Sequence, residues 1–137
     1  MIALLLTTAS ILSNSATASQ DAAKEGHRAI DLMWKCEGRG PNYVLAVEHD
    51  LPDPEFFGSF DLLACAEYIS GLADMNALYV GIYKRRAFFC FPELGIATDQ
   101  QIRVFMKWTD EYPERLHESK RVSVVSAFAE AFQCSAE

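Results

Sequence analysis

The sequence predicts an all-α protein, a compact bundle of about four helices stapled by two disulfides. Three features lead to this prediction. Apolar side chains recur at intervals of three and four residues along several segments, and clusters of proline and glycine separate those segments. The third feature is a set of four widely spaced cysteines, Cys36, Cys65, Cys90 and Cys134.

Residues 1–18 have the character of a secretory signal peptide. Residues 2–12 are mostly apolar, and Ala16-Thr17-Ala18 fits the small-x-small rule of signal peptidase. We therefore expect export and cleavage after Ala18, which leaves residues 19–137 as a single domain. Because no Lys or Arg precedes the apolar run, an ordinary N-terminal helix is the alternative, although such a helix would normally carry a polar face.

The first helix is predicted from Asp21 to Cys36, where apolar side chains follow helical spacing until the glycines and proline of residues 37–41 stop it. Residues 37–58 are predicted to be mostly loop, because each proline of Asp50–Pro54 disfavours helix in the residue before it. A short strand over Tyr43–Val47 is the alternative for part of this segment.

The central helix is predicted from about Ser59 to Arg86, with one broad apolar stripe along it. Glu67, Ser70 and Asp74 lie on another face beside Gly71. A glycine weakens a helix interior, so Gly71 suggests that another backbone packs close there. For the three polar side chains we favour hydrogen bonds to a neighbouring loop or a helix cap, and a binding face is the alternative.

The last third of the chain is predicted to hold a connector and two helices. Residues 87–97 are too apolar to form an exposed loop, and Pro92 and Gly95 make a helix unfavourable there. We therefore predict a packed connector that is held in place by Cys90. Thr98 and Gln101 form a capping-box pattern that opens a helix ending before Pro113. A final helix covers roughly residues 118–133. The predicted buried side of the helix that begins at Thr98 consists of Ile102, Phe105, Met106, Trp108 and Thr109. The predicted buried side of the final helix consists of Val122, Val125, Phe128, Ala129 and Phe132.

The cysteines predict two disulfides, because an exported chain of this size gains stability from them. Three pairings are open. We favour Cys36 with Cys65 and Cys90 with Cys134, since each bond would tie two successive helical segments.

The charge balance narrows the class of partner. The chain carries a formal net charge of −7, which argues against nucleic acid and against an anionic membrane surface. No run beyond the signal peptide approaches the roughly 20 apolar residues of a membrane helix, so the mature chain is expected to be soluble. A basic partner would be favoured, although moderate acidity that simply keeps the domain soluble is the preferred interpretation.

The residues give no support for catalysis. His27, His49 and His117 are scattered, and the chain has no serine elbow, no His-Glu-x-x-His and no glycine-rich phosphate loop. A cysteine nucleophile paired with His49 would require a free thiol. No C-x-x-C pair indicates a zinc or redox site. We expect no enzyme activity, no catalytic residue, no metal and no cofactor.

Several motifs, in this order and spacing, resemble one family. They are Cys65-x-x-Tyr68-Ile69-Ser70-Gly71-x-x-Asp74, Phe89-Cys90-x-Pro92, the helix from Thr98, Tyr112-Pro113-Glu114 and Phe132-x-Cys134. Over about Ile30 to Cys134 the chain is similar to the Rap/Tai family of periplasmic immunity proteins. Gln133 stands where the family often has proline, and residues 37–58 match no family pattern, which leaves the identity of the partner open.

The resemblance implies binding rather than chemistry. Members of the family neutralise peptidoglycan amidase effectors of type VI secretion, and they are small, helical, disulfide-bonded and often dimeric. This chain is accordingly expected to occlude an amidase in the periplasm. Dimerisation could use the stripe with Phe105 and Trp108, although core is the favoured role for both. A periplasmic acid-stress chaperone or an orphan envelope protein is the alternative function.

Site residues follow from position and from the family motif. The expected partner-binding residues lie on and around the connector: Arg85, Arg86, Glu93, Leu94 and Gly95. Residues 37–58 are the second choice for the partner-binding segment. An apolar connector is more often core than interface, which is the competing interpretation. The matching motif residues are expected to determine the fold rather than to contact the partner: Tyr68, Gly71, Asp74 and Pro92.

Overall fold

The computed structural model describes residues 26–135 and is all-α over that range, as predicted. Its helices are α2 (Ala29–Cys36), α3 (Pro41–Glu48), α4 (Pro54–Tyr83), α5 (Thr98–Glu111) and α6 (Lys120–Ala131), with a 3₁₀ turn over Pro113–Arg115. The predicted signal peptide and residues 21–25 of the predicted first helix lie outside the described residues. No helix between residues 26 and 135 is long and apolar enough to cross a membrane.

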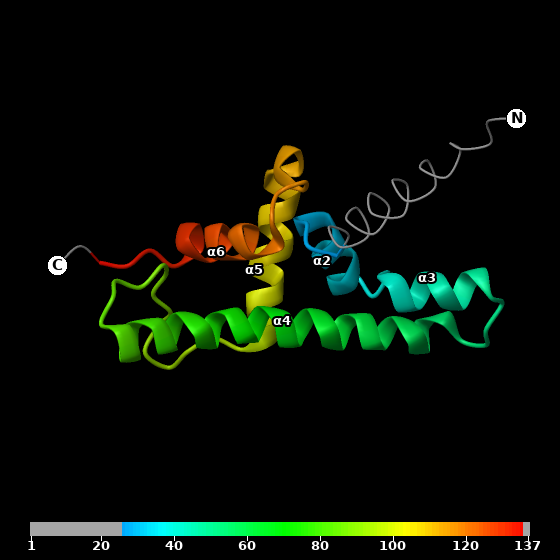
Figure 1. Ribbon diagram of the computed structural model, residues 1–137, viewed down its shortest axis with the longest axis horizontal. Coiled ribbons are helices and arrows are strands. Elements are labelled where there is room, and N and C mark those ends of the chain that lie inside the picture. The colour runs from blue at the N-terminus through cyan, green and yellow to red at the C-terminus, as the bar shows by residue number, and fades with distance from the viewer. Residues whose placement is uncertain (1–25, 136–137) are drawn as a thin grey trace, which may run out of the picture.

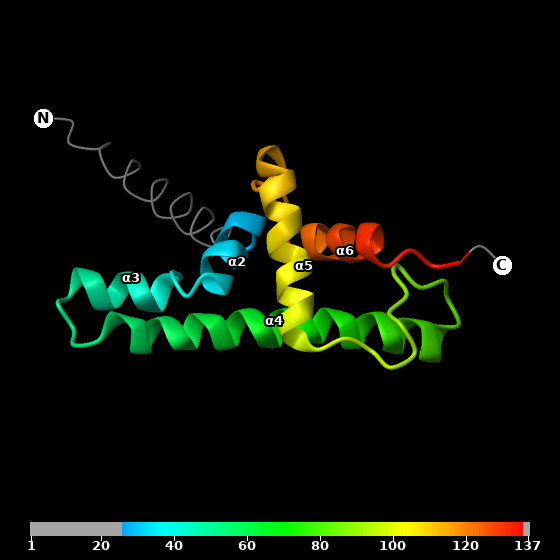
Figure 2. The same cartoon turned by 180° about the vertical axis from the view of Figure 1, so that it is seen from behind.

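The helix α4 forms a base, and the other helices lie along one side of it (Figures 1 and 2). At 30 residues α4 is roughly 45 Å long. The helices α2 and α3 lie over its N-terminal half, α5 crosses near its middle, and α6 and the connector lie over its C-terminal half (Figure 1). None of the other described helices lies on the opposite side of α4 (Figures 1 and 2).

The core forms where α2, α4, α5, α6 and the connector meet. Its buried aromatic side chains are Phe89, Phe105, Trp108 and Phe128, joined by Leu32, Ile69 and Val124. The predicted buried side of α5 is confirmed for Phe105, Trp108 and Thr109. Because Phe105 and Trp108 are core residues, they offer no surface for a dimer.

Both disulfides have the favoured pairing. Cys36–Cys65 joins α2 to α4, and Cys90–Cys134 joins the connector to the segment after α6. The first lies in the core, whereas both cysteines of the second are exposed. The described residues contain no free cysteine.

The prediction of a loop over residues 37–58 was wrong. The segment contains α3, which begins after Gly40 with Pro41 in its first turn, and α4 starts at Pro54 rather than Ser59. Proline is tolerated in the first turn of a helix, where its missing N–H has no intrahelical partner. Asp53 caps α4 by accepting the Phe56 backbone N–H at 3.2 Å.

The residue that fixes α3 lies on the next helix. Asp61 of α4 is fully buried and accepts hydrogen bonds from the Asn42 side-chain amide at 2.9 Å and from the Tyr43 backbone N–H at 3.0 Å. A carboxylate at a helix N-terminus satisfies orphan N–H groups and suits the helix dipole. A Cβ at Gly40 would lie 2.7 Å from the Asp61 carboxyl carbon, so only glycine fits there.

Other helix boundaries also differ from those predicted. The first helix begins at Ala29, because Gly26 has a φ of +84° and Arg28 is extended. The central helix ends at Tyr83, where Lys84 adopts a left-handed conformation. The capping box is absent, since the Gln101 amide instead donates to the Ile96 carbonyl.

The prediction for the buried side of the last helix was partly wrong. Val122 is exposed, while Val124 and Ala127 are buried with Phe128. The helix spans Lys120–Ala131, so it is also shorter at both ends than residues 118–133. The small side chains of Ser123 and Ala127 carry part of the packing of this helix.

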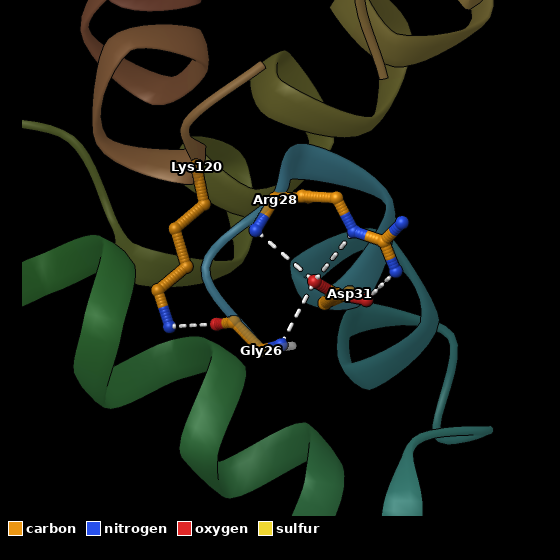
Figure 3. A network of polar contacts seen from close by, with 4 residues as sticks. All are labelled: Gly26, Arg28, Asp31 and Lys120. Carbon is orange, nitrogen blue, oxygen red and sulfur yellow. Dashed lines mark hydrogen bonds and ion pairs between the residues drawn. The ribbon is translucent and has the colours of Figure 1, made fainter. Parts of the chain in front are cut away.

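A polar network fastens the start of α2 to α6 (Figure 3). The Lys120 ammonium donates to the Gly26 carbonyl at 2.6 Å, and the Asp31 carboxylate accepts the backbone N–H groups of Gly26 and Arg28. Partial burial acts to raise the pKa of Asp31, but these bonds and the Arg28 guanidinium together hold that pKa below its usual value. The carboxylate is therefore stabilised in its charged form.

Candidate partner-binding site

The connector between α4 and α5 ends in a projecting turn. The Gly95 N–H donates to the Pro92 carbonyl at 2.7 Å, which closes a four-residue turn with Glu93 and Leu94 at its tip. Gly95 has a φ of +68°, a conformation that glycine adopts without strain. Leu94 is fully exposed, and Glu93 is exposed beside it.

The segment that leads into the turn, Phe88–Cys90, is braced from two sides. On the side of α4, the Asn76 carboxamide accepts the Phe88 N–H at 2.9 Å and donates to the Phe89 carbonyl at 3.0 Å. On the side of α6, the Cys90 N–H donates to the Phe132 carbonyl at 2.9 Å, next to the Cys90–Cys134 disulfide. These bonds hold both ends of the segment that leads into the turn.

The connector is core and surface at once. Phe89 is buried, with ring centroids of Phe91 and Phe128 at 5.0 and 5.1 Å. Phe88 remains exposed and stacks on Tyr79 at 5.3 Å. The apolar residues around Cys90 therefore anchor the segment, and its tip is left free to meet a partner.

Arg85 and Arg86 occupy the other end of the connector. Both are exposed and follow Lys84, the residue that caps the end of α4. The connector therefore presents the cations of Lys84, Arg85 and Arg86 at its start and a carboxylate beside a leucine at its turn. All five residues expected to bind the partner lie on this one segment, and all five are exposed.

The second expected segment forms the far end of the molecule. Three apolar side chains of α3, Val44, Leu45 and Val47, remain about half exposed, as does Phe56 at the start of α4. This end lies opposite the connector along α4 (Figure 1). One chain thus carries two candidate surfaces at the two ends of its longest helix.

The polar face in the middle of α4 has no partner from the surrounding loops. The Ser70 hydroxyl bonds back to the Ala66 carbonyl of its own helix at 2.9 Å, and Glu67 and Asp74 are exposed. A Cβ placed on Gly71 would meet nothing within 4 Å, so no backbone within residues 26–135 packs against it. Among the described residues the favoured interpretation of hydrogen bonds to a loop was wrong, because Ser70 bonds only within its own helix.

Two of the motif residues have contacts. Tyr68 lies beneath the Lys120 ammonium, 4.5 Å from its ring centroid, and burial raises the pKa of its hydroxyl. Pro92 supplies the carbonyl that closes the connector turn. Asn76 was missed by the sequence analysis, because a single Asn in a helix gives no pattern that reveals its partner twelve residues later.

The described residues bring no catalytic or metal-binding group together. His27, His49 and His117 are all exposed, at the start of α2, the end of α3 and the approach to α6. No group of three or more His, Cys, Asp or Glu side chains within residues 26–135 could hold a metal ion.

Comparison with known proteins identifies the family. A search of curated proteins finds no match to the chain. The family model of the Rap1a immunity proteins matches residues 29–134, which span every described helix and both disulfides. The chain therefore belongs to the Rap1a immunity protein family.

Proposed function

We propose that this protein binds a peptidoglycan amidase effector of type VI secretion in the periplasm and blocks its catalytic groove with the connector turn. Membership of an immunity family supports a protein effector as the partner. The observation that carries the proposal is the braced turn of Glu93 and Leu94, because a rigid projecting segment enters a groove with little loss of conformational entropy.

The turn supplies the chemistry that occlusion needs. Leu94 gives an apolar side chain to fill a pocket, and Arg85 and Arg86 give cations for the rim. The activity is binding alone, so no residue of this chain takes part in a chemical step. Export would place the protein where an amidase attacks the cell wall, and two disulfides are consistent with an oxidising compartment.

The test uses oxidised protein lacking residues 1–18 and a panel of purified type VI peptidoglycan amidases. Each amidase digests purified peptidoglycan with and without an equimolar amount of this protein, and released fragments are measured by chromatography. We expect one amidase to lose its activity. Inhibition of none of them, in a panel that covers the known amidase classes, would contradict the proposal and favour a chaperone or envelope role.

A variant pair then tests the turn. Leu94→Asp should weaken inhibition about 30-fold, the size of an interface hot spot, without changing the fold, because the side chain of Leu94 is fully exposed. Val122→Asp is the matched control, since Val122 is an exposed apolar residue on α6. Equal inhibition by the Leu94→Asp variant and the unchanged protein would place the contact elsewhere.

A further inference from the structure

The two disulfides of this chain lie in different surroundings. Cys65 is completely buried and Cys36 has only 9% of its surface exposed, so the Cys36–Cys65 bond lies inside the core. Cys90 and Cys134 are both exposed. Thiol–disulfide exchange requires a thiolate to reach a sulfur atom, and exposed disulfides are the labile and regulatory class. Burial therefore protects one bond and leaves the other open to a reductant.

The exposed bond lies where it can act on the connector turn. Cys90 comes two residues before Pro92, whose carbonyl accepts the Gly95 N–H and closes the turn. Cys134 lies in the segment that follows α6. The bond therefore ties the approach to the turn to a segment 44 residues later in the chain.

Few other contacts hold the segment after α6 against the connector. The Phe132 carbonyl accepts the Cys90 N–H at 2.9 Å, and the centroid of the Phe132 ring lies 5.0 Å from that of Phe91. Residues 133–135 are exposed and form no hydrogen bond with the rest of the described chain. The disulfide is therefore the covalent support for one hydrogen bond and one partly buried ring contact.

The remaining anchors of the connector do not depend on this bond. On the side of α4, the Asn76 carboxamide bonds the Phe88 N–H and the Phe89 carbonyl, and the Phe89 side chain is buried in the core. Beyond the turn, the Gln101 side-chain amide donates to the Ile96 carbonyl at 3.2 Å. Loss of the disulfide should therefore loosen the stretch between these anchors and leave the fold in place.

We propose that the Cys90–Cys134 bond is a redox switch for the connector turn. In the oxidised form both sides of the connector are fixed, whereas in the dithiol form residues 90–95 gain conformational freedom. A partner that binds the turn must then restrict this freedom, which lowers its affinity. This consequence for binding rests on the proposed function, but the change in the order of the turn does not.

The reductant is a protein dithiol of the thioredoxin type. One thiolate of the dithiol attacks one Sγ atom of the bond, the Cys90–Cys134 S–S bond breaks, and the displaced sulfur takes up a proton. The second thiolate of the reductant then attacks the reductant's own sulfur in the mixed disulfide and releases the other cysteine, which is also protonated. The reductant is oxidised to a disulfide, and two electrons and two protons reach the cysteine pair.

Reduced thioredoxin prepares the two forms for comparison. The oxidised protein lacking residues 1–18 is treated under native conditions until alkylation and mass mapping show free thiols at Cys90 and Cys134 with the Cys36–Cys65 bond intact. A double variant, Cys90→Ser with Cys134→Ser, gives the open form without a reductant. Resistance of the Cys90–Cys134 bond to thioredoxin, or reduction of both bonds together, would overturn the proposal.

Hydrogen exchange then measures the order of the turn without any partner. The N–H groups of Cys90 and Gly95 are hydrogen-bonded in the oxidised protein, and both should exchange at least about tenfold faster in the open form. The Phe88 N–H is the matched control, because it is bonded to Asn76, and its exchange should change less than about twofold. Unchanged exchange at Cys90 and Gly95, or equal acceleration at Phe88, would overturn the proposal.

The inhibition assay tests the consequence for binding. An amidase that the oxidised protein inhibits should require about tenfold more of the double variant for the same inhibition, because the open turn must be ordered on binding. Val122→Ser, a polar substitution at an exposed site of α6, is the control and should inhibit as the unchanged protein does. Equal inhibition by the open and oxidised forms would overturn the regulation of binding while the proposed function stands. If neither form inhibits any amidase, the proposed function fails, and the exchange rates still decide the switch.

Discussion

Asp61→Ala is expected to release α3 from α4. The Asp61 carboxylate is fully buried and reaches across to the first turn of α3. It accepts the side-chain N–H of Asn42 at 2.9 Å and the backbone N–H of Tyr43 at 3.0 Å. A further contact to the Asn42 backbone N–H is long, at 3.4 Å. Alanine would remove every one of these acceptors.

The magnitude follows from those two good hydrogen bonds. A bond to a charged group is worth about 1.5–3 kcal/mol, and some of the loss is recovered because water can reach the exposed Asn42. We expect a loss of about 3 kcal/mol in the free energy of unfolding, equivalent to roughly 10 °C in Tm for a domain of this size. If α3 opens locally at lower cost, the global loss is capped and α3 alone frays.

Urea unfolding and hydrogen exchange together measure both outcomes. Exchange should accelerate at the backbone amides of residues 44–48, while the amides of α5 keep their protection. Asp53→Ala is the matched control, because it removes an exposed cap with one bond of 3.2 Å and should cost only about 1 kcal/mol. Asp61→Asn, which keeps an acceptor oxygen but no charge, should fall between the two.

One result would refute the reasoning about α3. If Asp61→Ala costs no more than Asp53→Ala and leaves exchange in α3 unchanged, the carboxylate does not hold that helix. The helix would then depend on its apolar contacts with α4 alone.

The remaining predictions concern the disulfides and pH. Mild dithiol treatment should reduce the exposed Cys90–Cys134 bond before the buried Cys36–Cys65 bond. Alkylation of the released thiols and mass mapping would show the order. Equal rates of reduction would contradict the argument that burial protects the Cys36–Cys65 bond. Folding lowers the pKa of Asp31 from its ordinary value of 3.8. The charged Asp31 side chain therefore contributes its full stabilisation well above pH 3.8, and this stabilisation is lost as the pH falls through the lower pKa of the folded state. Asp31→Asn should therefore flatten the fall in stability between about pH 5 and 2, and an unchanged pH profile would contradict this.

The fold class and the disulfide pairing could be predicted because they depend on long patterns. The apolar spacing around Phe105 and Trp108 persists over several turns, and both side chains are core. The pairing followed from the order of helical segments along the chain. Patterns that extend over ten or more residues survive errors at individual positions.

The helix α3 could not be predicted, because its stabilising group is distant in sequence. Its eight residues are short for an isolated helix, and the Gly40-Pro41 pair at its start is typical of a loop. The carboxylate that caps it comes from Asp61, about twenty residues later and inside another helix. Asn76 and the connector pose the same problem, since one side chain fixes two backbone groups twelve and thirteen residues away.

The central helix explains why a periodic pattern can mislead about burial. Apolar residues surround much of α4. Leu62 and Tyr83 belong to the broad apolar stripe of its sequence, yet both are exposed. The core needs only the side that meets the other helices, through Cys65 and Ile69. A helix that is apolar beyond its core-facing side implies a second surface to cover. In this chain the exposed apolar side chains extend along α4 from Phe56 near its start to Ile82 near its end.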